Sequence, residues 1–311
     1  MHNALIQMTA LMLLGASWRV FSPNQLQADQ TRLVLTTTVY YFFLPAMVLS
    51  VLWQAELGKQ SLQYSLLGCS SILVGIVLSW LLAKLFRFKN PQTGALILAA
   101  AYPNVTYLGL PVLEQTFGSW ARSVVIQIDL FAAAPMVFSL GIAIARHYGQ
   151  DHAADQGKSW LGFFNAPPFW AALIAVLLNK TGVPAPSWLL GLLDKMSSAV
   201  APLMIFSLGL ALSWRGVPLR NLSYIAPVAI IKLLLLPIWA IWMVNWLDLA
   251  QDYRAAAVMD IAMPSMVLGI VFCDRYQLDS ALYAATVTIT TALSLLSLPF
   301  WYSQLLFDVA L

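Results

Sequence analysis

The stretch AAAYPNVTYLGLP, residues 99–111, is unusual for its surroundings. It lies inside an apolar run that has the length of a membrane helix, yet it contains two prolines, an asparagine, a threonine and a glycine. Proline removes a backbone donor, and its ring clashes with the preceding helical turn. In lipid, the carbonyl groups that lose their partners must find others. The stretch therefore predicts a helix that is interrupted inside a membrane.

The composition of the whole chain indicates an all-α membrane protein. Of its 311 residues, 60% are apolar and 9% are charged, whereas soluble domains have about 45–50% and about 25%. Apolar windows of about 20 residues recur along the chain, and this is the length that crosses ~30 Å of hydrocarbon. The N-terminal window lacks the Lys and Arg residues that open a signal peptide, so we interpret it as the first span.

Ten spans are expected, and the charges between them predict an orientation. The spans are residues 3–20, 33–54, 63–86, 92–112, 121–145, 165–181, 192–213, 222–247, 254–273 and 280–306. Lys and Arg gather in the odd-numbered loops, at Arg19, Arg32, Lys84, Arg87, Lys89, Arg146, Lys158, Arg215, Arg220 and Arg275, with fewer on the other side, at Lys59, Arg122, Lys180, Lys195 and Arg254. Positive loops are cytoplasmic. We therefore expect a multi-pass protein of the bacterial inner membrane with both termini on the periplasmic or extracellular side.

The two halves of the chain resemble each other. NVTYLG (104–109) aligns without gaps on PSMVLG (264–269), and Pro45 corresponds to Pro202. The halves are residues 1–145 and 165–311, joined by a cytoplasmic linker at 146–164. Five spans in each half would make the second copy enter from the opposite face, so an inverted repeat is expected.

Matched interruptions in an inverted repeat point to a transporter's binding site. The half-helix after each interruption begins with free N–H groups and a positive dipole end, which favours an anion. The expected substrate-binding residues are Pro103, Asn104, Thr106, Tyr107, Pro264 and Ser265. The alternative is that these prolines only kink their helices, as is expected of Pro45, Pro135, Pro202, Pro237 and Pro299.

Three ionisable residues fall well inside apolar spans: Asp129, Lys232 and Asp260. Such groups usually pair or line a cavity. One interpretation is a Lys–Asp pair with a second carboxylate that binds a coupling proton. The alternatives are a structural ion pair and a lysine that extends to the membrane interface. The hydroxyls of Thr286, Thr288, Thr290 and Thr291 form a polar patch that is expected to serve helix packing.

The sequence resembles the auxin efflux carrier family, which includes plant PIN-type carriers and bacterial permeases. The resemblance rests on NVTYLGLPVLEQTFG (104–118), NAPPFWAALIAVLLNKTGV (165–183) and APLMIFSLGLAL (201–212). It implies a scaffold domain from spans 1, 2, 6 and 7 and a transport domain from spans 3–5 and 8–10, with broken spans 4 and 9 crossing. It also implies organic anions as substrates, namely auxin in plants and dicarboxylates such as malate or malonate in bacteria. The long cytoplasmic loop of plant members is missing.

These observations predict a secondary transporter for a small organic anion, with proton coupling left open. The alternatives are an uncoupled facilitator, a channel-like permease and a transporter-like sensor. An enzyme is not expected, because no nucleophile–base pair or metal cluster falls at membrane depth, and no cofactor or nucleic-acid partner is indicated. Cys69 and Cys273 lie within or beside spans, so no disulfide is expected. The expected partners are the anion, the lipid bilayer and, as an open alternative, a second copy of the chain.

Overall fold

A computed structural model of the chain describes residues 2–21, 23, 26–55, 57–149, 166–211 and 221–309. Among these residues the regular secondary structure is entirely helical, apart from one isolated β-bridge between Pro103 and Ser265. Most of the predicted linker at 146–164 lies outside the described residues, and so do Lys158, Arg215 and Arg220.

The described chain divides into two compact units. Unit 1 is drawn from Met1–Ser61, Thr106–Ile126 and Phe163–Leu212, and unit 2 from Leu62–Val105, Gln127–Gly162 and Ser213–Leu311. Unit 1 contains α1 (His2–Phe21), α2 (Ala28–Thr38), the π-helix η2 (Val39–Phe43), α3 (Leu44–Gln54), most of the π-helix η3 (Val105–Gly109), α6 (Leu110–Phe117), most of α7 (Ala121–Ile128), α10 (Pro167–Lys180) and α11 (Ser187–Ala211).

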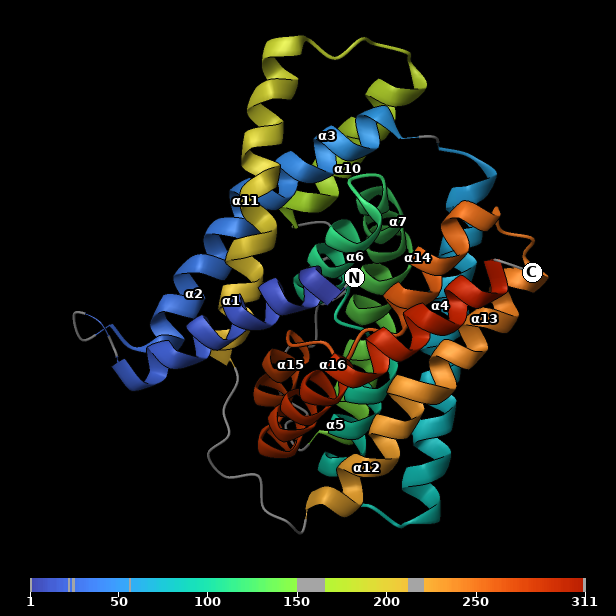
Figure 1. Cartoon of the computed structure of the whole chain (residues 1–311). Coiled ribbons are helices and arrows are strands. Elements are labelled where there is room, and N and C mark those ends of the chain that lie inside the picture. Colours follow the sequence, from blue (N-terminus) through green and yellow to red (C-terminus); the bar gives the residue numbers. More distant parts are fainter. Residues whose placement is uncertain are drawn as a thin grey trace. The chain divides into compact units, whose positions relative to one another are not determined.

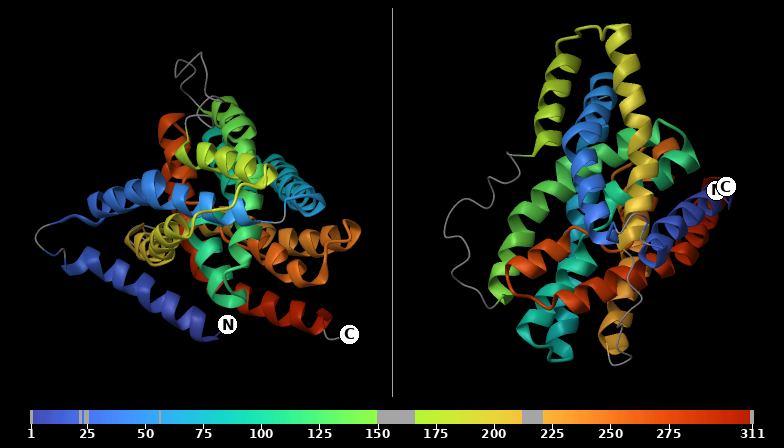
Figure 2. Two further views of the ribbon diagram at one scale, coloured as in Figure 1. Left: turned by 90° about the horizontal axis from the view of Figure 1, so that it is seen from above. Right: turned by 90° about the vertical axis from the view of Figure 1, so that its left-hand side faces the viewer.

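Unit 2 contains the remaining helices. They are most of α4 (Lys59–Leu85), then α5 (Asn90–Ala101), the π-helix η4 (Asp129–Ala133), α8 (Ala134–Met136), the π-helix η5 (Val137–Gly141), α9 (Ile142–Tyr148), α12 (Leu222–Ile230), the π-helix η8 (Ile231–Leu235), α13 (Leu236–Trp246), α14 (Gln251–Ile261), α15 (Gly269–Arg275) and α16 (Ser280–Val309). The long C-terminal helix α16 is the red element of Figure 2.

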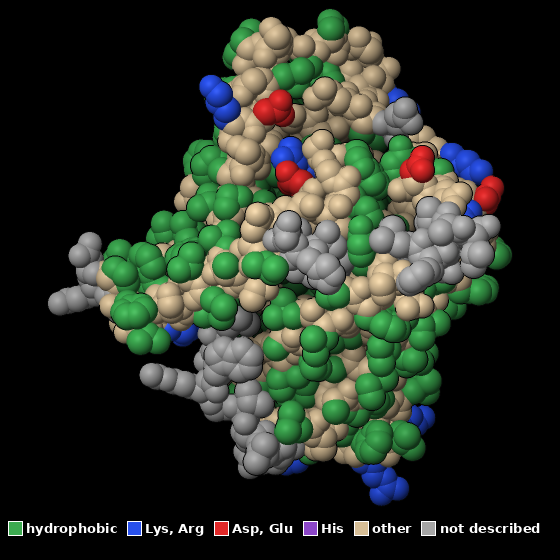
Figure 3. Space-filling model, in the orientation of Figure 1, with side chains coloured by type: hydrophobic (Ala, Val, Ile, Leu, Met, Phe, Trp, Pro, Cys, Tyr) green, Lys and Arg blue, Asp and Glu red, His purple; other side chains and the backbone are tan. Residues whose placement is uncertain are grey.

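Six helical stretches of the described chain are long and apolar enough to cross a membrane. They are Ala28–Gln54, Lys59–Leu85, Ala121–Tyr148, Ser187–Ala211, Leu222–Trp246 and Ser280–Leu305. Two shorter apolar helices, Thr9–Phe21 and Pro167–Lys180, match two further predicted spans. Large apolar side chains are exposed along several of these helices, and Figure 3 shows them spread over the visible face. An exposed apolar surface of this kind is suited to contact with lipid rather than water.

Several prolines inside apolar helices follow a widened turn. Each of the π-helices η2, η3, η4 and η8 begins six residues before a proline, at Pro45, Pro111, Pro135 and Pro237. In three of them the residue just before the proline donates its N–H to the carbonyl five residues earlier, as Leu236 does to Ile231. The proline ring would clash with the carbonyl four residues before it. The wider turn moves that carbonyl away, so the helix continues through the proline.

Unit 1 is held together by two pairs of adjacent helices, α1 with α11 and α3 with α10 (Figure 1). Between α1 and α11 the contact is backbone against backbone, because a Cβ atom placed on Gly209 would lie 2.0 Å from the carbonyl oxygen of Met12. Small residues permit this close approach of membrane helices. Between α3 and α10, Asn179 donates from Nδ2 to the carbonyl oxygens of Leu52, Trp53 and Ala55 at 3.2, 2.8 and 2.8 Å.

We expect Asn179→Ala to destabilise unit 1. The last carbonyls of α3 have no partner within their own helix, and the variant would remove the amide that serves them. Loss of such bonds at a partly buried site costs about 2 kcal/mol, which corresponds to a fall of about 5 °C in apparent Tm for a chain of this size. Thermal unfolding in detergent measures it. Asn221→Ala is the control, since Asn221 makes no side-chain capping bond. Equal Tm values for the two variants would contradict the role given to Asn179.

Candidate functional site

Two helices of the chain are interrupted at the predicted prolines. Helix α5 ends at Ala101, and helical structure resumes as η3 at Val105, so that residues 102–104 are non-helical around Pro103. Helix α14 ends at Ile261, and α15 begins at Gly269, so that residues 262–268 are non-helical around Pro264. The predicted interruptions are therefore confirmed as breaks in the helix and not as kinks.

The two interrupted segments pair with each other inside unit 2. Pro103 and Ser265 form an antiparallel bridge. The Asn104 N–H donates to the Pro264 carbonyl at 2.8 Å, and the Met266 N–H donates to the Tyr102 carbonyl at 3.0 Å. Backbone groups that each break would leave without a partner thus bond to the other break, as an apolar medium requires. Two stretches 160 positions apart in the sequence meet at one point.

Polar side chains without partners are buried at this pairing. Asn104 is 1% exposed, and neither its Nδ2 nor its Oδ1 has a hydrogen-bond partner within the described chain. Ser265 is 0% exposed, and its Oγ also lacks one, although its backbone N–H donates to Thr290 Oγ1 at 3.3 Å. A buried polar atom without a partner costs about 1–3 kcal/mol. A polar molecule that supplied these missing hydrogen bonds would therefore gain more binding free energy here than at groups that are already paired.

The six predicted binding residues lie in two different parts of the structure. Pro103, Asn104, Pro264 and Ser265 come together in the paired segments. Thr106 and Tyr107 follow in η3, where both are partly exposed and each interacts with another group. They are grouped with unit 1, whereas the other four residues lie in unit 2.

Two tyrosines support the interrupted segments, and the sequence reasoning missed both. The hydroxyl of Tyr283 on α16 donates to the Met266 carbonyl at 2.5 Å, and that of Tyr102 donates to the Met136 carbonyl at 3.0 Å. A Cβ atom at Gly269 would lie 2.0 Å from the Tyr283 hydroxyl, so a glycine is needed where α15 begins. A buried tyrosine needs a hydrogen-bond partner for its hydroxyl. Tyrosines inside apolar spans could have been singled out from the sequence for this reason.

The three intramembrane charges lie in unit 2. Asp129 is the first residue of η4, Lys232 lies in η8, and Asp260 lies in the last turn of α14, four residues before Pro264. Asp260 is within electrostatic range of both Asp129 and Lys232. Lys232 and Asp260 are 0% exposed, and their charged atoms make no hydrogen bond within the described chain. Lys232 is therefore enclosed by protein on all sides.

A family model described as a membrane transport protein matches residues 1–302 of the chain. The chain belongs to the membrane transport protein family. This family includes auxin efflux carrier-like proteins, so the resemblance seen in the sequence is confirmed.

Similar members of the family come from archaea and bacteria. An uncharacterized transporter of Methanothermobacter thermautotrophicus is 27% identical over 303 residues, which cover 96% of each chain. An uncharacterized transporter of Methanocaldococcus jannaschii is 26% identical over 299 residues, 94% of each chain. The uncharacterized transporter YfdV of Escherichia coli is 23% identical over 227 residues, 70% of each chain. The family membership establishes a membrane transporter with several spanning helices.

In this membrane transport protein the threonines of α16 serve mainly their own helix. Thr286, Thr288 and Thr290 donate to the carbonyls of Leu282, Ala284 and Thr286 at 2.8–2.9 Å. The fourth, Thr291, is also buried, but its Oγ1 makes no hydrogen bond within the described chain. Thr290 does more, because its hydroxyl also accepts the Ser265 N–H and thereby ties α16 to the second interrupted segment.

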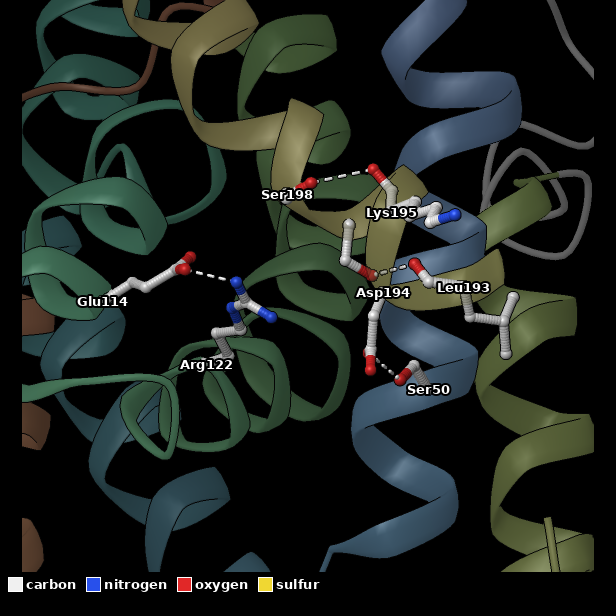
Figure 4. Close-up of polar contacts among 8 residues, drawn as sticks. Ser50, Glu114, Arg122, Leu193, Asp194, Lys195 and Ser198 are labelled. Carbon is white, nitrogen blue, oxygen red and sulfur yellow. Dashed lines mark hydrogen bonds and ion pairs between the residues drawn. The ribbon is translucent and has the colours of Figure 1, made fainter. Parts of the chain in front are cut away.

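Polar contacts also join the elements of unit 1 (Figure 4). Arg122 forms an ion pair with Glu114 across the turn between α6 and α7. Ser50 on α3 donates to Asp194 on α11 at 3.1 Å. Within the described part of the chain, no three His, Cys, Asp or Glu side chains are placed to hold a metal, and Cys69 and Cys273 are free thiols.

Proposed function

We propose that this membrane transport protein is a secondary transporter for a small organic carboxylate, which binds where the two interrupted helices pair. The observation that carries the proposal is the set of buried, unpartnered polar atoms on Asn104 and Ser265. They come from opposite segments, and they lie beside the antiparallel bridge.

The chemistry of these two side chains suits a carboxylate. The Asn104 amide offers two N–H donors, and the Ser265 hydroxyl offers one. A carboxylate is an acceptor with two oxygens, so donors from both segments can bind it at the same time. Hydrogen bonds to a charged acceptor are worth about 1.5–3 kcal/mol each. Neutral donors hold the anion without a fixed ion pair, which allows it to leave again on the other side.

The transport mechanism we propose is alternating access. A transport domain would carry the interrupted segments against a scaffold domain, within ten spans arranged as two inverted five-span repeats. The division of the chain into unit 1 and unit 2 supports a two-domain mechanism. The excess of Lys and Arg in the odd-numbered loops supports an inner-membrane protein with both termini outside.

Other kinds of membrane permease remain as alternatives to be separated by flux measurements. An uncoupled facilitator would show saturation and counterflow of labelled substrate without accumulation, whereas a channel-like permease would show neither. A transporter-like sensor would bind the carboxylate without moving it. Reconstituted vesicles loaded with unlabelled malonate and supplied with labelled malonate distinguish these outcomes.

Asn104→Ala is expected to weaken carboxylate binding by about tenfold or more, because one charge-assisted hydrogen bond is worth at least about 1.4 kcal/mol. The measurement is a thermal-shift titration of purified protein with malonate, malate and indole-3-acetate, since a ligand that binds only the folded state raises Tm by an amount that grows with the ratio of its concentration to its Kd. The wild-type chain should be stabilised by at least one acid, and Asn104→Ala should need a tenfold higher concentration for the same shift.

Asn221→Ala is the matched control for this titration, because it removes the same amide from a residue outside the paired segments. It should keep the wild-type response. If Asn104→Ala responded to the stabilising acid as the wild type does, the binding site would have to lie elsewhere. If no acid stabilised the wild type, a carboxylate substrate would be contradicted.

A further inference from the structure

Three ionisable side chains from three different helices form one electrostatic cluster in unit 2. Asp260 interacts electrostatically with both Asp129 and Lys232. Two of these residues occupy the widened turns that precede prolines, Asp129 in η4 before Pro135 and Lys232 in η8 before Pro237. π-Turns of this kind occur frequently at functional sites. We call Asp129, Lys232 and Asp260 the charge cluster.

Burial differs among the members of the charge cluster. Lys232 and Asp260 are 0% exposed, whereas Asp129 is partly exposed. The Lys232 Nζ atom and both Asp260 carboxylate oxygens have no hydrogen-bond partner within the described chain. Asp129 has a further interaction partner. The cluster thus has an inner part with no access to water and one member that reaches the surface of the unit.

The helices that pack most closely against α14 and η8 add no further charge in the described part of the chain. Helix α14 packs against α13 and α16, and η8 packs against α12, α13, α16 and α5. Helices α5 and α13 carry no ionisable side chain, α12 carries only Tyr224, and the described side chains of α16 include only Tyr283 and Tyr302. The Tyr283 hydroxyl is already bonded to Met266. Helix α14 itself carries Asp252, Tyr253 and Arg254, at its opposite end.

The number of bound protons sets the net charge of the charge cluster. With a charged lysine and two carboxylates it holds one net negative charge, which is expensive in an apolar environment. One additional proton makes the cluster neutral, whichever of its members carries that proton. Removal of either carboxylate also makes it neutral, and the additional proton is then no longer required.

We propose that Asp260 and Asp129 share one exchangeable proton, with Lys232 as their fixed cation. Asp129 exchanges the proton with water, and Asp260 stores it four residues before Pro264. The proton adds to a carboxylate oxygen on loading and returns to water on release, so no other bond changes. Coupling of this proton to transport rests on the proposed function. It requires that the carboxylate bind at the paired segments, next to the stored proton.

Infrared spectroscopy of the purified full-length protein tests the proton directly, without any substrate. We expect the wild type to show a carboxylic-acid C=O band that disappears at high pH and shifts in D₂O. The band should be lost in both Asp260→Asn and Asp129→Asn. It should grow about twofold in Lys232→Met, where both carboxylates must be protonated to keep the cluster neutral. Because this third variant changes the band in the opposite direction, misfolding cannot account for the whole pattern.

Asp274→Asn is the control, since it makes the same substitution at an exposed position on α15 and should keep the band. The proposal is overturned if the wild type shows no titrating band, or if the band survives in both Asp260→Asn and Asp129→Asn.

Transport in vesicles then separates coupling from the proposed function. An imposed pH gradient should increase malonate uptake several-fold in the wild type and in Asp274→Asn. In Asp260→Asn, uptake should be the same with and without the gradient. A ratio that stays at the wild-type value in Asp260→Asn refutes coupling through the cluster. No malonate uptake by the wild type counts against the proposed function, while the infrared result still decides whether the cluster holds a proton.

Discussion

Gly209→Leu should unfold unit 1 under conditions in which the wild-type chain is stable. A Cβ atom at Gly209 would lie 2.0 Å from the Met12 carbonyl oxygen and 3.0 Å from the Ala16 nitrogen. The contact is reciprocal, because a Cβ atom at Gly15 would lie 2.2 Å from the Phe206 carbonyl oxygen. Backbone atoms cannot rotate out of the way, so α1 would have to move off α11 along its length. Overpacking alone costs about 1–3 kcal/mol, and the lost contacts of α1 add to it.

Thermal unfolding monitored by size-exclusion chromatography in detergent measures this effect. The expected result is a fall in apparent Tm of about 7 °C or more, from a loss of about 3 kcal/mol or more in a chain of this length. Gly191→Leu provides a strict control, because Gly191 lies on the same helix and a Cβ atom there meets nothing within 4 Å. If the two leucine variants melted together, the backbone contact between α1 and α11 would not be what stabilises unit 1.

Gly75→Leu should abolish carboxylate binding through a change outside the binding residues. Gly75 lies on α4, and a Cβ atom there would lie 2.8 Å from the Cα atom of Ala101 and 3.4 Å from Leu236. Ala101 is the last residue of α5, and the next residue, Tyr102, accepts the Met266 N–H in the pairing of the two segments. A leucine at position 75 would displace the first segment and with it the donors of Asn104, and each lost hydrogen bond to a charged ligand costs about 1.5–3 kcal/mol.

The readouts for Gly75→Leu are the malonate thermal shift and malonate uptake into vesicles, and both should fall to background. Val77→Leu is the matched variant, since Val77 is two residues away on the same helix and is 52% exposed. That variant adds volume on the exposed side, so its binding should remain that of the wild type. Normal malonate binding by Gly75→Leu would show that the approach of α4 to Ala101 does not position the segment.

The interruptions could be predicted from the sequence because their cause is local. Pro103 and Pro264 lack a backbone donor whatever surrounds them, and the polar residues that follow them indicate where the helix ends. The long apolar helices could be predicted for the same reason, since composition and length decide them. The positions of Asn104 and Ser265 next to these breaks follow from the same local cause.

What the sequence could not supply depends on contacts between distant residues. The bonds from Tyr283 to Met266 and from Ser265 to Thr290 join helices whose proximity no periodicity indicates. The grouping of residues 106–126 with unit 1 is likewise a matter of packing. The π-turns are a different case. Four of them begin six residues before a proline, at Pro45, Pro111, Pro135 and Pro237. Pro202 and Pro299 lie inside helices without such a turn, so the clash of the proline ring alone does not predict where one forms.

The bridge between Pro103 and Ser265 has a mechanical consequence. Each interrupted segment satisfies backbone groups of the other, so neither can swing away by itself without exposing bare amide groups to hydrocarbon, at several kcal/mol per group. We therefore expect the two segments to move together. The carboxylate proposed to bind beside them would then move with both segments, because motion of one segment alone would break the backbone bonds of the pairing.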